Sequence, residues 1–258
     1  MRRTTVRRTA LAASTLSLAL LVSGCGSEGS AAKEESKGKT SSGAPTAPAT
    51  TSAQNVLSQA ELDKLVLAEA DLKDHKVAKP TQADLASSKT VTTDKAACKP
   101  LGDVMALRAP GSPGASATRK VMAVPKGPGA SASAEEKAKA GLDALGSTIT
   151  ADTLASYSGR GAADALAALK KAGADCAGGF SLIAEGDKTA FKVSPASYTA
   201  GDEAVAFTLT ADLDGEPGTS HLVAIRQGTT LATFYAFSLA GKAEQPKAVI
   251  DAQLKKLA

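Results

Sequence analysis

The stretch EAVAFTLTADLDGEPGTSHLVAIRQGTTLATFYAFSL, residues 203–239, decides the fold of this chain. Apolar and polar side chains alternate through three segments of it, and turns with Asp214-Gly215 and Gln227-Gly228 separate the segments. Alternation with a period of two is typical of strands with one buried face, and Gly-containing dipeptides between such runs favour hairpins. The stretch therefore predicts an antiparallel meander with strands at 203–211, 221–227 and 229–239.

The segments before this stretch add strands and helices to the expected fold. Further strands are expected at 120–124, 147–157, 180–184 and 189–193, with short strand-like pieces around Val77 and Val91. Helices are expected after the capping box Ser58–Glu61, between Asp94 and Leu107 with Pro100 as an alternative start, and at 134–145, 159–174 and 248–257, with Gly173 as the stop of the fourth. This order predicts an α+β domain over residues 54–258, with one antiparallel sheet and helices packed mainly on one face.

The N-terminus reads as an export signal. Four arginines lie within the first eight residues, and an apolar run of about 13 residues, 10–22, follows. A membrane-spanning helix needs about 20 apolar residues, so this run is too short to cross. It ends in Leu21-Val22-Ser23-Gly24-Cys25, which resembles the lipobox of bacterial lipoproteins. We therefore predict a lipoprotein signal peptide at 1–24.

The resemblance to a lipobox implies that Cys25 is the lipidation site and carries acyl chains such as palmitate. Several acyl chains hold a protein firmly at a bilayer, so the expected location is the extracellular face of the cell membrane. An ordinary secreted protein with a chance cysteine near the cleavage site is the alternative. Arg7-Arg8 leaves the choice between the Sec and Tat export routes open.

Residues 25–53 are expected to be a disordered tether. From Gly26 on they contain Ser, Gly, Ala, Thr, Pro, Lys and Glu but no large apolar side chain. Such a segment buries too little apolar surface to offset the entropy of ordering it.

Charge and aromatic content argue against nucleic acid as a partner. The formal net charge is +4, and the four arginines of the signal account for all of it. The chain has no Trp and only 3% aromatic residues, so rings on which bases could stack are few. The expected partners are therefore the membrane, through lipidated Cys25, and a small ligand or an envelope protein.

Cys98 and Cys176 remain once Cys25 is assigned to the lipid. An even pair of cysteines in an oxidising compartment predicts a disulfide. A metal site would need more ligands, and the only histidines, His75 and His221, have no close spacing to the cysteines. No metal and no cofactor are predicted.

Three motifs suggest catalysis or ligand binding, and each has a simpler structural interpretation. Gly159–Asp164 resembles a dinucleotide fingerprint, but Asp164 replaces the third glycine, so a tight strand-to-helix turn is favoured. Asp212–Glu216 lacks the ligands of a full calcium loop and suits a hairpin. His221 follows Ser220, but the sequence places no triad around them, so a half-exposed strand histidine is favoured. No catalytic residue and no enzymatic activity are predicted.

Short motifs give the domain a resemblance to a known family. They include Ala70-Asp71-Leu72, Cys98-Lys99-Pro100-Leu101, Ala155-Ser156-Tyr157, Gly201-Asp202-Glu203-Ala204 and the run Val223–Gly228. With them the chain resembles actinobacterial lipoproteins related to the extracellular sensor domain of PknH-type kinases. The chain departs from that family in allowing one disulfide instead of two and in lacking tryptophan. The resemblance implies a domain with a cleft for an extracytoplasmic ligand and assigns no ligand-binding residue.

Two functional hypotheses follow from the sequence. The first is a membrane-anchored, non-enzymatic ligand-binding or sensor-like domain. The alternative is an envelope structural or protein-interaction module that uses a sheet face or an edge strand. A hydrolase that depends on His221 is a third, weaker possibility.

Overall fold

The structure is a computed structural model that describes residues 56–258 except 126, 128, 130 and 214. The predicted signal peptide and the whole predicted tether, with Cys25, lie outside the described residues. The described part folds as an α+β domain with a nine-stranded sheet in which all named strand pairs are antiparallel. The predicted fold class and antiparallel sheet are confirmed.

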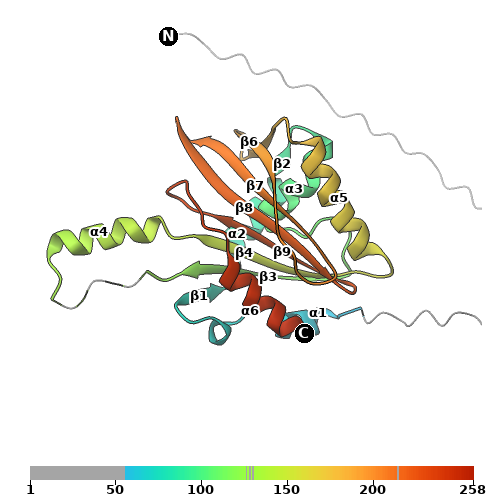
Figure 1. The fold of residues 1–258 in the computed structure, drawn as a ribbon, viewed down its shortest axis with the longest axis horizontal. Coiled ribbons are helices and arrows are strands. Elements are labelled where there is room, and N and C mark those ends of the chain that lie inside the picture. Colours follow the sequence, from blue (N-terminus) through green and yellow to red (C-terminus); the bar gives the residue numbers. More distant parts are fainter. Residues whose placement is uncertain (1–55, 126, 128, 130, 214) are drawn as a thin grey trace, which may run out of the picture. The chain divides into compact units, whose positions relative to one another are not determined.

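The strand order is β1-β3-β4-β9-β8-β7-β6-β5-β2 (Figure 1). The strands are β1 (His75–Ala78), β2 (Thr92–Thr93), β3 (Ala115–Ala123), β4 (Ile149–Ser156), β5 (Phe180–Ala184), β6 (Asp187–Ala196), β7 (Glu203–Leu213), β8 (Glu216–Gln227) and β9 (Thr230–Phe237). Strands β5 to β9 follow one another in both sequence and space, so the predicted meander is confirmed.

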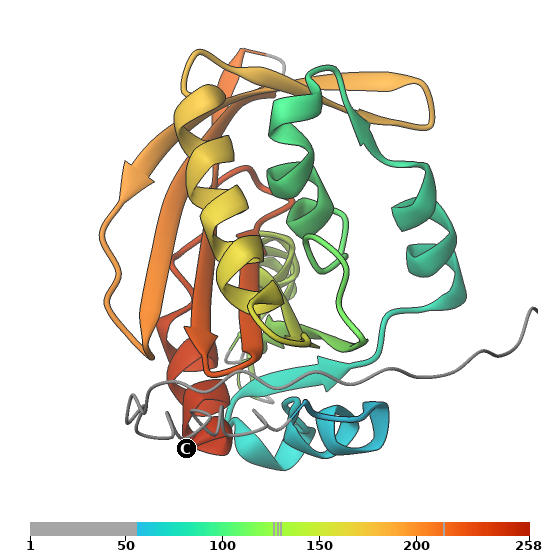
Figure 2. The same ribbon diagram turned by 90° about the vertical axis from the view of Figure 1, so that its right-hand side faces the viewer.

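The helices lie on both faces of the sheet. They are α1 (Gln59–Leu65), α2 (Gln82–Thr90), α3 (Lys99–Met105), α4 (Ala134–Leu145), α5 (Gly161–Asp175) and α6 (Lys247–Leu257). Figure 2 shows α3 and α5 across one face, with α2 farther to the side. This face carries the larger core, in which Leu166 and Leu169 of α5 pack with Leu222 of β8.

Helices α1 and α6 pack on the opposite face around Leu62, Phe234 and Ile250. The expectation of helices mainly on one face thus fits α2, α3 and α5, while a second, smaller core lies behind the sheet. The reason is visible in β4, where every residue from Thr150 to Ser156 is buried, including those on the face turned away from α5.

Gly173 does not end α5, contrary to the prediction. The helix continues to Asp175, and Gly173 is buried against the sheet. A Cβ atom at this position would lie 2.1 Å from the ring of Phe207 in β7. The glycine is therefore required for the close approach of helix and strand.

Helix α3 begins at Lys99, next to the alternative start expected at Pro100, and not at Asp94. Cys98 is the N-cap of α3, and Pro100 lies in the first turn, where its missing N–H has no helical partner to lose. The Asp94 carboxylate accepts a hydrogen bond from the Ser181 N–H at 2.8 Å, beside the β2–β5 pair. Cys98 forms a disulfide with Cys176 at the end of α5, with Cα atoms 5.9 Å apart.

Helix α4 has the predicted bounds and lies in the β3–β4 connection, extending beyond the sheet (Figure 1). Within the described residues, no helix has the length and apolar character needed to span a membrane.

Candidate binding groove

A cavity of about 410 Å³ lies between α2, α3 and the strands β3, β4 and β9. Its floor follows from the strand register. Met122 of β3 lies opposite Ile149 of β4, which lies opposite Phe237 of β9. In the next row, Lys120, Ala151 and Tyr235 are aligned in the same way. Because side chains alternate along a strand, both rows project to the face that carries α3 and α5.

Helix α2 forms the roof of this cavity, and a capping box starts it. The Thr81 hydroxyl accepts a hydrogen bond from the Asp84 N–H at 3.1 Å, and the Asp84 carboxylate accepts one from the Thr81 N–H at 2.7 Å. Ser88 is the one buried residue of this helix. Because α2 buries so little, its position depends on polar contacts at its two ends.

The first polar contact is an ion pair at the start of α2. Lys120 Nζ lies 3.0 and 3.1 Å from the two carboxylate oxygens of Asp84. Hydrogen bonds from the Thr81 N–H and from Lys120 hold the pKa of Asp84 below its usual value. This pair fixes the start of α2 over the strand β3.

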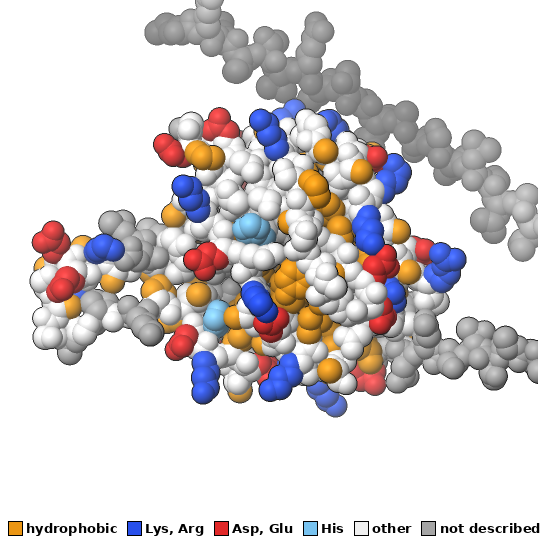
Figure 3. Space-filling model, in the orientation of Figure 1, with side chains coloured by type: hydrophobic (Ala, Val, Ile, Leu, Met, Phe, Trp, Pro, Cys, Tyr) orange, Lys and Arg blue, Asp and Glu red, His pale blue; other side chains and the backbone are white. Residues whose placement is uncertain are grey.

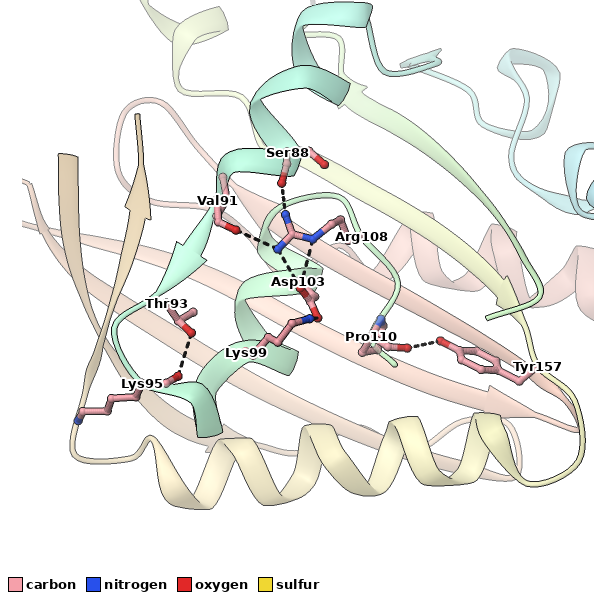
Figure 4. Close-up of polar contacts among 9 residues, drawn as sticks. All are labelled: Ser88, Val91, Thr93, Lys95, Lys99, Asp103, Arg108, Pro110 and Tyr157. Atoms are coloured by element: carbon pink, nitrogen blue, oxygen red, sulfur yellow. Dashed lines mark hydrogen bonds and ion pairs between the residues drawn. The ribbon is translucent and has the colours of Figure 1, made fainter. Parts of the chain in front are cut away.

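The second polar contact holds the end of α2 through Arg108 (Figure 4). The guanidinium donates to the backbone oxygens of Ser88 and Val91 and to Asp103, with Nη2–Oδ1 at 2.8 Å. Asp103 is buried in α3 and also binds Lys99 Nζ at 2.6 Å. Leu107, with φ of 60°, turns the chain at the end of α3, so that the Arg108 N–H donates a hydrogen bond to the Asp103 carbonyl oxygen.

Two aromatic side chains of β9 extend the apolar floor. The rings of Tyr235 and Phe237 stack with centroids 5.4 Å apart and planes 22° from parallel. Both rings also line a second cavity of about 150 Å³, which reaches Phe191 of β6 and Ala211 of β7. We call the two cavities together the apolar groove. It is marked by Met105, Ile149, Phe191, Ala211, Tyr235 and Phe237.

The apolar groove contains one buried hydroxyl without a hydrogen bond. Ser220 of β8 is 6% exposed, and its Oγ has no partner within the part of the chain that the structure describes. Ser220 lines the second cavity beside Tyr235 and Phe237. Burial raises the pKa of the Tyr235 phenol and the nearby Ser220 hydroxyl offsets part of this rise, although the two groups do not reach hydrogen-bonding geometry. A buried polar atom without a partner costs about 1–3 kcal/mol, so a polar ligand atom that reached the Ser220 hydroxyl would gain a hydrogen bond there without displacing another.

Another cavity, of about 480 Å³, lies at the ends of β5, β6 and β7 and shares Phe191 and Ala211 with the second cavity of the groove. Its wall includes the stacked rings of Phe180 and Phe191. The acidic groups on its rim are already engaged, because Asp94 accepts from Ser181 and Asp212 accepts from the Gly215 N–H at 2.6 Å.

The structure separates the residues that the sequence singled out. His75 lies on β1 and His221 on β8, and Figure 3 shows the chain's two histidines well apart. Leu213 and Glu216 pair at the end of the β7–β8 hairpin, and Asp212 accepts a hydrogen bond from the Gly215 N–H, in agreement with the predicted hairpin. Gly159, with φ of 54°, lies in the turn before α5, also as predicted. Within the described ranges, no cluster of three or more His, Cys, Asp or Glu residues could hold a metal ion.

Sequence reasoning missed the groove residues Ser220, Tyr235 and Phe237. Ser220 precedes His221 in the chain, but successive side chains of a strand point to opposite faces. The hydroxyl therefore lies in the groove while the imidazole lies on the other face of the sheet. The alternation of β9 was visible in the sequence and placed Tyr235 and Phe237 on one face, but it could not show that this part of the face stays uncovered by α5.

No protein-family model matches the chain, and no curated protein matches it. Among solved structures, the extracellular domain of PknH from Mycobacterium tuberculosis matches with a TM-score of 0.45 and 10% identity, over 79% of this chain and 96% of that one. A putative uncharacterized protein (Rv0999 ortholog) from Mycobacterium smegmatis matches with a TM-score of 0.35 and 11% identity, over 76% and 94%. Both likenesses are weak, so the function has to be argued from this chain's own residues.

Proposed function

We propose that this protein is a membrane-anchored extracytoplasmic lipoprotein whose domain binds a small amphipathic ligand in a sensor-like, non-enzymatic role. The apolar groove with its unpartnered Ser220 hydroxyl is the observation that carries the binding role. The anchor rests on the lipobox-like residues 21–25 and the arginine-rich, apolar segment before them.

The groove has features that a role in folding alone does not explain. A helix placed for stability would bury an apolar stripe, but α2 buries Ser88 and leaves Leu85 40% exposed. Ion pairs and backbone hydrogen bonds hold α2 above the floor instead. Concave, largely apolar surfaces with few polar groups are typical of small-molecule sites, and about 410 Å³ lies in their usual range.

The same contacts give a route from binding to signalling. A ligand that contacts both α2 and the β9 rings stabilises the conformation in which α2 is held over the groove by its ion pair and by Arg108. A ligand shifts a conformational equilibrium by its difference in affinity for the two states. Bound and free protein would therefore present different α2 surfaces to a partner, while the fold of the sheet is unchanged.

Thermal-shift measurements with extracts of the cell envelope test the binding role. The protein is compared with Ala83→Trp, which places a large ring on an exposed position of α2 that lines the cavity. Ala86→Trp is the matched control, because Ala86 is exposed on the same helix and is not among the residues that line the cavity. We expect an extract component to raise the melting temperature of the original protein and of Ala86→Trp, but not that of Ala83→Trp. Extracts that stabilise all three proteins equally, or none, contradict the proposal.

A protein-interaction role is the second candidate, and the face of the sheet away from the groove favours it. Ser194, Thr208 and His221 are aligned across β6, β7 and β8 on that face and remain at least partly exposed. Crosslinking in cells from Thr208→Cys tests this role. A reproducible protein partner at this position, combined with no ligand-dependent stabilisation, would replace the binding proposal.

The anchor has its own test. We expect mass spectrometry of the mature protein to find Cys25 as the first residue with a diacylglyceryl modification. The Cys25→Ala protein should leave the membrane fraction. An unmodified Cys25 in membrane-bound protein contradicts the anchor without affecting the binding role.

A further inference from the structure

A third cavity adjoins the groove, and the side chains that line the three cavities change in character from one to the next. The cavity under α2 has Met105, Leu107 and Ile149 among its lining residues. It shares Tyr235 and Phe237 with the second cavity, which in turn shares Leu213 and Gly241 with a third of about 460 Å³. The third cavity has Glu216 and Lys242 on its rim. Apart from the Asp84–Lys120 ion pair and the serines of α2, the path begins apolar, and it ends beside charged groups at the β7–β8 hairpin.

Ser220 lies between these two ends, in the second cavity. A serine hydroxyl can donate a hydrogen bond to an acceptor such as a carbonyl oxygen. The stacked rings beside it provide apolar surface for the ligand atoms next to that acceptor. The order along the path is thus apolar surface, one hydrogen-bond donor, and then a charged rim.

The length of the path favours a chain over a compact ligand. From β4 it crosses β9 and β8 to β7, which are consecutive in the sheet, and the third cavity lies at the end of the β7–β8 hairpin. Strands lie about 4.8 Å apart, so this crossing alone is roughly 14 Å long, before the path turns along the hairpin. Leu213 and Leu239 line the third cavity and are 42% and 69% exposed, which gives the open end an apolar lip.

We propose that the groove binds a single-chain acyl amphiphile. Its alkyl chain lies under α2 and over the β9 rings, its carbonyl oxygen accepts a hydrogen bond from Ser220, and its polar head lies near Lys242 and Glu216. The inference rests on the proposed ligand-binding function and names the chemical class of the ligand.

A matched pair of probes tests the carbonyl contact. The ester 1-monopalmitoylglycerol and the ether 1-O-hexadecylglycerol have the same head and chain length, but the ether lacks the carbonyl. Below their micelle concentrations, we expect the original protein to bind the ester about tenfold more tightly, the effect of one buried hydrogen bond. In Ser220→Ala the two probes should bind equally, at the affinity of the ether.

Ser194→Ala is the control, because Ser194 is exposed and lies on the opposite face of β6. It should keep the tenfold preference. Thermal unfolding without ligand should show Ser220→Ala at least as stable as the original protein, since the variant removes an unpartnered buried hydroxyl. The comparison of ester with ether in the original protein needs no variant at all.

The outcomes separate the inference from the function on which it rests. Equal binding of ester and ether to the original protein overturns the inference, because Ser220 then does not meet the carbonyl. The inference also falls if neither probe binds while an envelope component still gives a stabilisation that Ala83→Trp abolishes; in that case the binding function stands. If neither the probes nor any extract binds in a manner sensitive to Ala83→Trp, the proposed function itself fails.

Discussion

Asp152 in β4 predicts an unusual dependence of stability on pH. It is fully buried between the sheet and the layer formed by α1 and α6, and neither carboxylate oxygen has a hydrogen-bond partner among the described residues. Burial raises the pKa of this carboxyl to about 8, while the charge of Arg119, the nearby Leu67 N–H and the charge of Lys256 act to lower it. The folded protein therefore keeps a proton on Asp152 at neutral pH.

The sign of the effect follows from the two states. In the unfolded chain this carboxyl loses its proton near pH 3.8, and in the folded chain near pH 8. Between these values the folded state holds one more proton, so raising the pH favours unfolding. Each pH unit then lowers the free energy of unfolding by about 1.4 kcal/mol, or about 3 kcal/mol from pH 5 to pH 7.

The Asp152→Asn protein should lose this slope, because the amide does not titrate. At pH 7 we expect it to be more stable than the original protein by on the order of 4 kcal/mol, with the difference vanishing toward pH 4. Urea-induced unfolding at pH 4, 5, 6, 7 and 8 measures both curves. Other titrating groups are present in both proteins and cancel in the difference.

Asp63→Asn is the matched control. Asp63 lies in α1 on the same side of the sheet, 3.9 Å from Arg119, but its side chain is 46% exposed. Its curve should keep the slope of the original protein. Parallel curves for Asp152→Asn and the original protein between pH 5 and pH 8 would show that the folded carboxyl is already ionised and would refute the reasoning.

Three further predictions concern the frame of the groove. Arg108→Ala leaves Asp103 buried with one cation fewer and frees the end of α2, so urea unfolding should show a loss of about 3 kcal/mol; a loss below 1 kcal/mol would mean that α2 is held by other contacts. Replacing Cys98 and Cys176 with Ser opens a loop with a sequence separation of 78 and should lower the free energy of unfolding by about 4 kcal/mol, and reduction of the original protein should give the same value. Gly173→Ala forces a methyl group against Phe207 and should cost about 1–3 kcal/mol in urea unfolding, whereas Ala174→Gly, at the exposed neighbouring position, should cost about 1 kcal/mol or less.

The meander was predictable because the information is local. Val205, Phe207 and Leu209 alternate with smaller or polar residues, and the turn residues lie between such runs. One buried face and a short connection are enough to fix antiparallel pairing of neighbours. Strands β7 and β8 are longer than predicted, because their pairing continues past the apolar core to Leu213 and Glu216.

Helix α2 was missed because its apolar pattern is weak. It contains two serines and a threonine and buries one residue, so no stripe of apolar side chains marks it. The capping box formed by Thr81 and Asp84 was nevertheless present in the sequence, and it is a signal that does not depend on burial. The roof of the groove could have been found from that signal alone.

Asp152 shows why burial on both faces is hard to read from a strand. Ile149, Ala151 and Thr153 were correctly placed on one face by their alternation. Asp152 lies between two of these residues, so the alternation predicts that its side chain faces solvent. It is instead covered by α1 and α6, whose positions depend on contacts with residues more than 90 positions away, such as the bond from the Leu67 N–H to Gln253 at 3.0 Å.

Ser220 and His221 illustrate the same limit at the groove. Side by side in the sequence, they suggest a nucleophile and a base that act together. Because successive side chains of a strand point to opposite faces of the sheet, the two residues have different surroundings and cannot act together. His221 lies on a partly exposed polar row, where it needs no partner, whereas Ser220 lies among aromatic rings, where an unpaired hydroxyl is costly. A binding site is thus indicated by the residue whose polarity its own surroundings do not satisfy, and here that residue is the serine.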